Sequence, residues 1–441
     1  MSADNIRRVI QKIDFTLTDE EIDNLCEKYI EAVRNETYNF SSFRREIYSK
    51  NGKKRIIYSF PKLSIENILC HYLKQQLDRI FHIKYASRGK IINLLFNTLV
   101  ATKNMNDFVL VRADFKSFFD SVNSEYVYNK YILPSIIKRE DKQVLEKYVR
   151  NFKYCYAGLC LSNGLTEIIC RDFDVVLRAK LSEYGVFFYE RYVDDMLLMF
   201  NSYISQDEIK ELIKKTIQEV FATCPVRLSN KGGKFSYISR RNLKNSQSFN
   251  FLGYEFYIKY SIDSNGEERL VFEYGISKIK REKYSNNIER AFLNYKKTGN
   301  IELFRQRLKV FSTRVVIARQ LMGSSLDWLT KGVVANYNEL RHYSGSLNSD
   351  TREFLEKLYY QLLKKYGLKR PYFIPKSSKE ETKYNLYSNL KKNRTLLFDE
   401  TIGVPKNVIL KWIYKIDPSY SSKGKDYYRI VIEYLEMIKI N

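Results

Sequence analysis

The chain has 441 residues and a formal net charge of +24, from 75 Lys and Arg against 51 Asp and Glu. A chain of this length holds two or three domains, and its hydrophobic content of 44% excludes a largely disordered protein. So large an excess of positive charge favours a polyanionic partner. The aromatic content of 15% agrees with such a partner, because rings among basic residues stack on bases.

Cysteine and histidine usage excludes a zinc-binding pattern. The six Cys residues form no CxxC pair, and the chain has only three His. Reduced thiols in a cytoplasmic protein are therefore expected. The start of the chain, MSADNIRRVIQKIDF, lacks the apolar region of a signal peptide, and no stretch approaches ~20 uninterrupted apolar residues. We expect a cytoplasmic protein without a membrane partner.

The first hundred residues predict helices around a basic strand. Thr18 to Glu21 fit a capping box, followed by a run with helical apolar spacing. An Asn51-Gly52 turn leads into the β-rich segment KKRIIYSF. Next, IENILCHYLKQQLDRIF predicts an amphipathic helix, and Arg88, Gly89 and Lys90 precede another one. A glycine flanked by two cations at a helix start predicts a phosphate contact.

Two apolar segments each meet carboxylates. The run FVLVRAD (108–114) predicts a strand that ends at Asp114, and helix-like sequence follows to about residue 182. The run FFYERYVDDMLLMF (187–200) then predicts two short strands joined at a turn that carries Asp194 and Asp195. A solvated turn is the alternative for an isolated Asp pair, because Asp favours turns for local reasons.

Three carboxylates at the ends of adjacent buried strands predict a metal site. Like charges held close together are costly unless a cation neutralises them. Hard carboxylate oxygens suit Mg²⁺, which also takes oxygens from a substrate phosphate. The chemistry that uses such a cluster is two-metal phosphoryl transfer.

At these positions the chain resembles reverse transcriptases. RYVDD (191–195) resembles their central motif, and RADFKSFFD (112–120) resembles their first catalytic motif. The resemblance implies that Asp114, Asp194 and Asp195 are catalytic and bind two Mg²⁺ ions, with the Phe115 carbonyl as a further ligand. Phe119, five residues after Asp114, falls where the family places a bulky residue against the sugar 2′ position. A ring there would collide with a ribose hydroxyl, so dNTPs are the expected substrates; ordinary core packing is the alternative.

The resemblance also implies contacts to the incoming nucleotide. Lys54 and Arg55 are candidates to hold the triphosphate by charge-assisted contacts, with a solvated edge strand as the alternative. Arg88 matches the family's second finger motif loosely. In VRLSNKGGKFSYI (226–238), Lys231 and Lys234 compete for the lysine that assists pyrophosphate departure.

One motif departs from most of the family. Most reverse transcriptases have Pro-Gln-Gly where this chain has Leu161-Ser162-Asn163-Gly164. Ser162 and Asn163 are the candidates to face the templating base pair, and a helix-capping turn is the alternative. The departure resembles the defence-associated lineage of bacterial reverse transcriptases, the unknown-group and abortive-infection enzymes.

The rest of the chain predicts a hairpin and then mainly helices. FNFLGYEFYIK (249–259) resembles the family's primer-grip hairpin, with Leu252 and Gly253 as the matching pair. From about residue 275 to 345 the sequence predicts three basic amphipathic helices, consistent with a thumb. They are SKIKREKYSNNIERAFLNYKK, IELFRQRLKVFSTRVVIARQLM and SLDWLTKGVVANYNELRHYSG. Beyond 346, helical segments flank a Pro- and Lys-rich connector and carry no motif.

The expected fold is α+β: a right-hand polymerase with fingers, palm and thumb, an antiparallel palm sheet and a helical C-terminal region. The expected division is an N-terminal helical extension (1–50), fingers and palm (51–260), a helical thumb (261–345) and a C-terminal helical region (346–441).

The expected function is RNA-directed DNA synthesis in an antiviral defence system, with a noncoding RNA as template. Three alternatives stay open: a retron-type enzyme making RNA-linked DNA, a template-independent, protein-primed DNA polymerase, and a non-catalytic RNA-binding scaffold. An RNA-dependent RNA polymerase would require Phe119 to play no part in sugar selection. The sequence leaves open a second polymerase or effector protein as partner, and a homo-oligomer.

Overall fold

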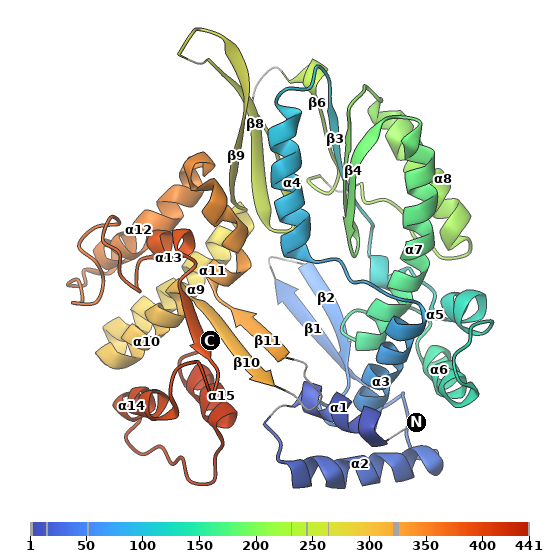
Figure 1. The fold of residues 1–441 in the computed structure, drawn as a ribbon, viewed down its shortest axis with the longest axis horizontal. Helices are drawn as coiled ribbons and strands as arrows, with labels where there is room; N and C mark the ends of the chain where they lie inside the picture. The colour runs from blue at the N-terminus through green and yellow to red at the C-terminus, as the bar shows by residue number, and fades with distance from the viewer. Residues whose placement is uncertain are drawn as a thin grey trace. The chain divides into compact units, whose positions relative to one another are not determined.

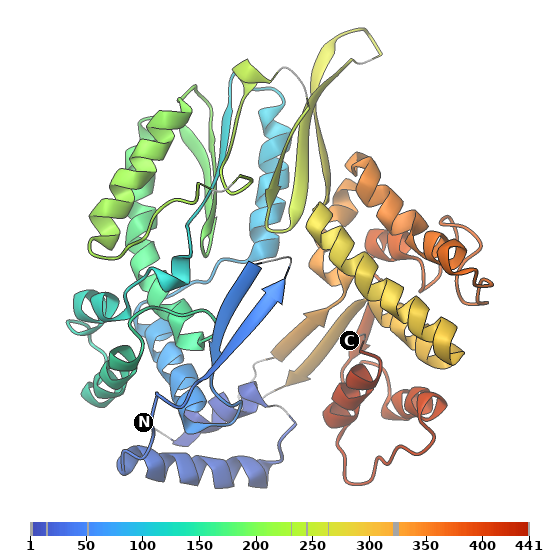
Figure 2. The same ribbon diagram turned by 180° about the vertical axis from the view of Figure 1, so that it is seen from behind.

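The computed structural model describes residues 3–14, 16–50, 53–230, 232–243, 246–262, 264–320 and 326–439. The chain forms two compact units, Met1–Lys244 and Asn245–Asn441. Figures 1 and 2 show the elements of both units from opposite sides. The fold is α+β with several antiparallel sheets, as the sequence predicts.

The N-terminal unit begins with two helices and a hairpin. Helix α2 has the predicted capping box, because Thr18 and Glu21 each bind the other's backbone N–H. Strands β1 and β2 pair antiparallel with Arg44 opposite Ser59. The predicted Asn51-Gly52 turn lies outside the described residues. The elements are α1 (Ala3–Ile13), α2 (Asp19–Arg34), β1 (Arg44–Lys50), β2 (Lys53–Ser59), α3 (Ile65–Ile80) and α4 (Arg88–Thr102).

A four-stranded sheet forms the centre of this unit. Its order is β4-β5-β3-β6, and every neighbouring pair is antiparallel. With helix α7 before β4 and helix α8 after β5, the chain follows the split β-α-β-β-α-β motif. The elements are β3 (Val109–Asp114), α5 (Ser124–Val127), α6 (Arg139–Asn151), α7 (Cys160–Ser182), β4 (Val186–Tyr192), β5 (Asp195–Phe200), α8 (Gln206–Phe221) and β6 (Ser236–Ser239), with single helical turns at Phe118–Asp120, Tyr128–Ile132 and Arg240–Asn242.

The two central strands are almost entirely buried. All six residues of β3 are buried, as are the five residues of β5 that follow Asp195. Their apolar runs are continuous rather than alternating, which is typical of strands covered on both faces. A carboxylate at the end of either strand is therefore held next to a rigid core.

The C-terminal unit contains two three-stranded sheets and several helices. The sheet β7-β8-β9 is antiparallel, whereas in β11-β10-β12 the pair β10–β12 is parallel. The strands are β7 (Gln247–Phe251), β8 (Tyr254–Ile262), β9 (Glu268–Ile276), β10 (Arg314–Gln320), β11 (Leu326–Lys331) and β12 (Thr395–Phe398). The helices are α9 (Lys278–Thr298), α10 (Ile301–Ser312), α11 (Val333–Asn336), α12 (Ser349–Tyr366), α13 (Leu386–Lys391), α14 (Lys406–Ile416) and α15 (Tyr427–Met437), with a 3₁₀ segment at Asn338–Ser346.

The prediction of three long helices between 275 and 345 is wrong for the second and third segments. The first forms α9, but the second ends as a helix at Ser312 and continues as β10. The third begins with β11 and has only short helical turns after it. The β-branched run Val315-Val316-Ile317 favours a strand, and antiparallel pairing with β11 satisfies its backbone.

Candidate active site

The ends of two neighbouring strands bring the three predicted carboxylates together. Asp114 ends β3 and lies opposite Asp195, the first residue of β5. The backbone N–H of Phe115 donates to the carbonyl of Asp194 at 3.1 Å. The expected arrangement, a hairpin turn with two carboxylates beside a third from the next strand, is thus present.

The hairpin turn adopts an unfavourable backbone conformation at Val193. Its φ is +60°, in the left-handed region that a β-branched residue rarely adopts. Such strain costs roughly 1–3 kcal/mol and persists only where the surroundings impose it. The surroundings here include Arg191, which donates from Nη1 to the Val193 carbonyl at 2.9 Å.

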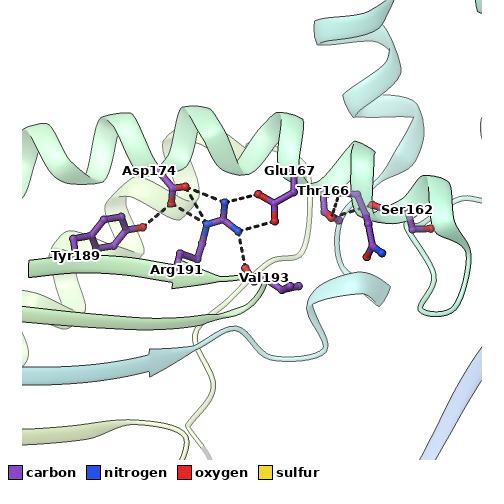
Figure 3. A network of polar contacts seen from close by, with 8 residues as sticks. Ser162, Thr166, Glu167, Asp174, Tyr189, Arg191 and Val193 are labelled. Atoms are coloured by element: carbon purple, nitrogen blue, oxygen red, sulfur yellow. Dashed lines mark hydrogen bonds and ion pairs between the residues drawn. The ribbon is translucent and has the colours of Figure 1, made fainter. Parts of the chain in front are cut away.

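Arg191 is buried and is the centre of a polar network that fixes the turn to α7 (Figure 3). It binds both oxygens of Glu167, at 3.1 and 2.8 Å. It also binds Asp174, at 2.9 Å from Nε and 2.9 Å from Nη2. Tyr189 donates to Asp174 at 2.6 Å. We call these four side chains the arginine clamp; they hold the carboxylate-bearing turn in place.

Sequence reasoning missed the arginine clamp. Glu167 and Asp174 are seven residues apart on α7, so they share one face of the helix. The available signal was this pair of acids on one helix face, together with Arg191 in the RYVDD motif. Nothing in the sequence showed that Arg191 is the partner of the two acids.

Two cations of the same chain already contact the carboxylates. Arg112 binds Asp195 with both nitrogens of one edge, at 2.8 and 3.0 Å. Its third nitrogen donates to the Gly233 carbonyl at 2.7 Å. Lys234 forms an ion pair with Asp114. Among the described residues, the Asp194 carboxylate has no ion pair.

Burial and mutual repulsion make the site unfavourable for negative charge. Burial raises the pKa of Asp194 to about 6, and the nearby charge of Asp114 acts in the same direction. Burial also raises the pKa of Asp195, whereas Arg112 opposes this shift. A cation that binds near Asp194 would therefore stabilise the ionised carboxylates.

The donor set suits a hard divalent cation, but the side chains are turned to their internal partners. No group of three or more His, Cys, Asp or Glu side chains poised to hold a metal occurs in the described part of the chain. Lys234 is 44% exposed and can turn away from Asp114, whereas the Arg112 side chain is 9% exposed and bidentate. A cation at this site would replace Lys234 most easily.

The candidate sugar gate, Phe119, belongs to a segment that lies within electrostatic range of Arg55 on strand β2. The Phe119 ring is half-buried, with its centroid 5.9 Å from that of Phe118. Burial raises the pKa of the neighbouring Asp120, and the charge of Arg55 on β2 opposes this. Arg55 is thus close to the segment that carries Phe119. Lys54 is exposed on the same strand.

The loop before α7 is built around Gly158, which sequence reasoning also missed. Its φ is +104°, and a Cβ there would lie 2.4 Å from the Tyr58 carbonyl oxygen. The Tyr58 N–H donates to the Ala157 carbonyl at 2.9 Å, and its ring stacks on Tyr156 at 4.4 Å. These contacts join strand β2 to the segment that leads into the Ser162-Asn163 motif.

The Ser162-Asn163 motif lies inside α7, which begins at Cys160, rather than ahead of it. Ser162 is fully buried, with its Oγ 3.4 Å from the Tyr148 hydroxyl. Asn163 is exposed and borders a cavity of about 170 Å³ together with Val193. Of the pair, only Asn163 offers a side chain beside the hairpin turn.

The remaining candidates are more scattered. Arg88 is the first residue of α4, whose N-cap is Ser87. Lys231 lies outside the described residues. Lys234 forms an ion pair with Asp114. Leu252 and Gly253 form the β7–β8 turn of the C-terminal unit, with φ of 49° and 83°.

Comparison with known proteins adds no assignment. No family model matches the chain, and no match was found among the curated proteins. None of the helices in the described ranges combines the length and apolar character needed to cross a bilayer.

Proposed function

We propose that this chain is an RNA-directed DNA polymerase of an antiviral defence system, which makes DNA from dNTPs on a noncoding RNA template. One observation carries the proposal: Asp114, Asp194 and Asp195 meet at one edge of a four-stranded antiparallel sheet. The catalytic motifs quoted above for reverse transcriptases contain these same three residues.

Asp114, Asp194, Asp195 and the Phe115 carbonyl would hold two Mg²⁺ ions. When bound, the ions would supply activation of the attacking hydroxyl and charge stabilisation at the leaving pyrophosphate. The chain's own residues position this donor set, because the arginine clamp fixes the turn that carries Asp194 and Asp195. Lys234 keeps Asp114 paired in the resting protein and would be free to contact phosphate oxygens once displaced.

The resemblance assigns the remaining candidates to the nucleotide and to the primer. Arg55, Lys54 and Arg88 would contact the triphosphate, since guanidinium and ammonium groups bind phosphate oxygens strongly. Phe119 would exclude a ribose 2′-hydroxyl. Leu252 and Gly253 would hold the primer end. In this proposal the two units correspond to a right-hand polymerase with fingers, palm and thumb, and the net charge of +24 supports a nucleic-acid partner.

A second candidate is a non-catalytic RNA-binding scaffold. The observation that favours it is that Asp114 and Asp195 are neutralised by Lys234 and Arg112 of the same chain. Buried ion pairs of this kind also occur in purely structural sites. The two functions differ in whether the carboxylates are needed for synthesis or only for stability.

Primer extension tests the proposal. The full chain is incubated with Mg²⁺, labelled dNTPs and an RNA template that carries a DNA primer. The double variant Asp194→Ala/Asp195→Ala is assayed in parallel. The control variant is Asp207→Ala, at an exposed position of α8. Synthesis by the wild type and the control but not by the double variant supports polymerase activity. Equal RNA binding by all three proteins without synthesis by any of them supports the scaffold.

A further inference from the structure

A second candidate site lies within the C-terminal unit, in a cavity of about 500 Å³. Residues of α10, β12 and α14 line it, and Figure 1 shows α10 and α14 in this unit. Cavities of this size are typical of small-molecule sites. The sequence carries no motif here.

One of the residues that line the cavity is a buried lysine. Lys309 is 6% exposed, and its Nζ lies 3.0 Å from the centre of the Trp412 ring. Among the described residues, the only hydrogen bond of its ammonium group is to Gln306, at 3.4 Å. No carboxylate in the described ranges forms an ion pair with it. A buried ammonium group without an anion is costly, so structures normally provide one.

The charges around Lys309 make a bound anion still more favourable. Lys383 and Arg394 line the same cavity, and no acidic residue does within the described ranges. Burial, together with the charges of Lys383 and Arg305, lowers the pKa of Lys309 to about 7. The first turn of α14, which borders the cavity, has neither a capping side chain nor an acidic residue. Within the described ranges, every charged group that lines this cavity therefore favours an anion.

Apolar residues form another part of the lining, which we call the apolar wall. It includes Ile402, which is 77% exposed, with Val404 and Val408. The Val404 N–H donates to the Leu397 carbonyl at 2.9 Å. A Cβ at Gly403 would lie 2.3 Å from the backbone nitrogen of Asp399. The loop therefore packs so closely on this backbone that a side chain at position 403 would collide with it. A preformed wall lowers the ordering cost of binding.

We propose that this cavity binds a nucleoside phosphate, with its phosphate held by Lys309, Lys383 and Arg394 and its base against the apolar wall. Three cations in the lining suit phosphate oxygens, and the apolar wall of the same cavity suits a flat ring. The ligand is either a free mononucleotide or the phosphorylated end of a nucleic-acid strand. This inference does not depend on the proposed polymerase activity.

Calorimetric titration of the full chain with AMP tests the proposal. EDTA is present, so that metal-dependent binding at the carboxylate site does not contribute. AMP binds the wild type with one-to-one stoichiometry. Lys309→Met and Arg394→Gln each weaken binding by at least about tenfold, because each removes a charge-assisted contact. Lys411→Met, at an exposed position of α14 outside the cavity, binds as the wild type does.

Three further ligands complete the experiment. Adenosine and inorganic phosphate both bind at least about tenfold more weakly than AMP, since each lacks half of the recognised group. A 5′-phosphorylated oligonucleotide that binds more tightly than AMP identifies a strand end as the ligand, and weaker binding identifies a free nucleotide. The proposal is overturned if AMP does not bind, if Lys309→Met and Arg394→Gln bind it normally, or if adenosine or phosphate binds equally well. Arg394 is only partly buried, so its variant stays informative if Lys309→Met misfolds.

Discussion

Asp114 and Asp195 face each other across β3 and β5, and each is already paired with a cation, Lys234 and Arg112 respectively. The paired carboxylates keep the strand ends stable in the resting protein. They also mean that any incoming divalent cation competes with the chain's own charges. This competition has measurable consequences.

Replacing Lys234 by methionine should make the protein more dependent on divalent ions. Without metal, the variant should lose about 1–2 kcal/mol of unfolding free energy, because Asp114 loses its partner while Lys234 is too exposed for a larger effect. Mg²⁺ should restore more stability to the variant than to the wild type. Urea unfolding with and without Mg²⁺ measures both, with Lys215→Met, at an exposed position of α8, as control. An equal Mg²⁺ effect in the variant and the wild type would argue against a metal site here.

Replacing Arg191 by methionine should be far more damaging. The variant leaves Glu167 and Asp174 without their cation and should lose about 3–5 kcal/mol of unfolding free energy. It should also lose synthesis, since Val193 and the following carboxylates lose their support. The matched control is Arg150→Gln, at a 73% exposed side chain, which should change stability by less than about 0.5 kcal/mol. Normal synthesis by Arg191→Met would show that the arginine clamp does not position the site.

Phe119→Ala should relax sugar selection. If the ring blocks a 2′-hydroxyl, its removal should raise ribonucleotide incorporation at least about tenfold relative to dNTP incorporation. Competition between labelled ATP and dATP measures the ratio. Phe187→Ala, at a partly exposed ring of β4, is the control. An unchanged ratio in Phe119→Ala would assign the ring to packing alone.

Two glycines near α7 should respond oppositely to alanine. Gly158→Ala should destabilise the protein by more than about 1 kcal/mol, because its φ is +104° and the new Cβ meets the Tyr58 carbonyl. Gly164→Ala should be neutral or stabilising by up to about 1 kcal/mol, since it is helical and the nearest atom lies 3.7 Å away. Chemical denaturation of both variants measures the difference. Equal destabilisation would contradict the described close contact between Gly158 and β2.

The buried Lys309 predicts how stability depends on pH. In the unfolded chain the lysine keeps its proton up to its ordinary pKa of 10.5, but in the folded protein it releases the proton near pH 7. The cost of burial is therefore full below about pH 7 and disappears as pH rises towards 10.5. Lys309→Met should be more stable than the wild type at pH 6, and this advantage should shrink by pH 10. An advantage that does not change with pH would show that Lys309 is not buried as a charged group.

The sequence predicted those parts of the fold that depend on local pattern. The buried strand ending at Asp114 and the hairpin at Asp194 both follow from short apolar runs that meet carboxylates. The placement of the carboxylates follows from two strand ends. By contrast, Arg191 meets Glu167 and Asp174 only through the packing of α7 on the sheet, which no local pattern encodes.

The same reasoning explains the failed helix prediction. The local signal for strand β10 is only the short run Val315-Val316-Ile317, and its two partners are β11 and the distant β12. Pairing across such a separation is not visible in a local pattern. The residues that line the cavity around Lys309 come from α10, β12 and α14 and are far apart in the sequence. Only the folded chain brings their charges together, so no local pattern predicts this cavity.

Sequencing the RNA and DNA that co-purify with the chain tests the central claim most directly. The wild type, expressed with its native flanking DNA, is compared with the double variant Asp194→Ala/Asp195→Ala. RNA-directed synthesis predicts one RNA enriched with both proteins, and complementary DNA with the wild type only. The same DNA with both proteins, DNA without a complementary RNA, or the enriched RNA with no DNA in either sample would contradict it.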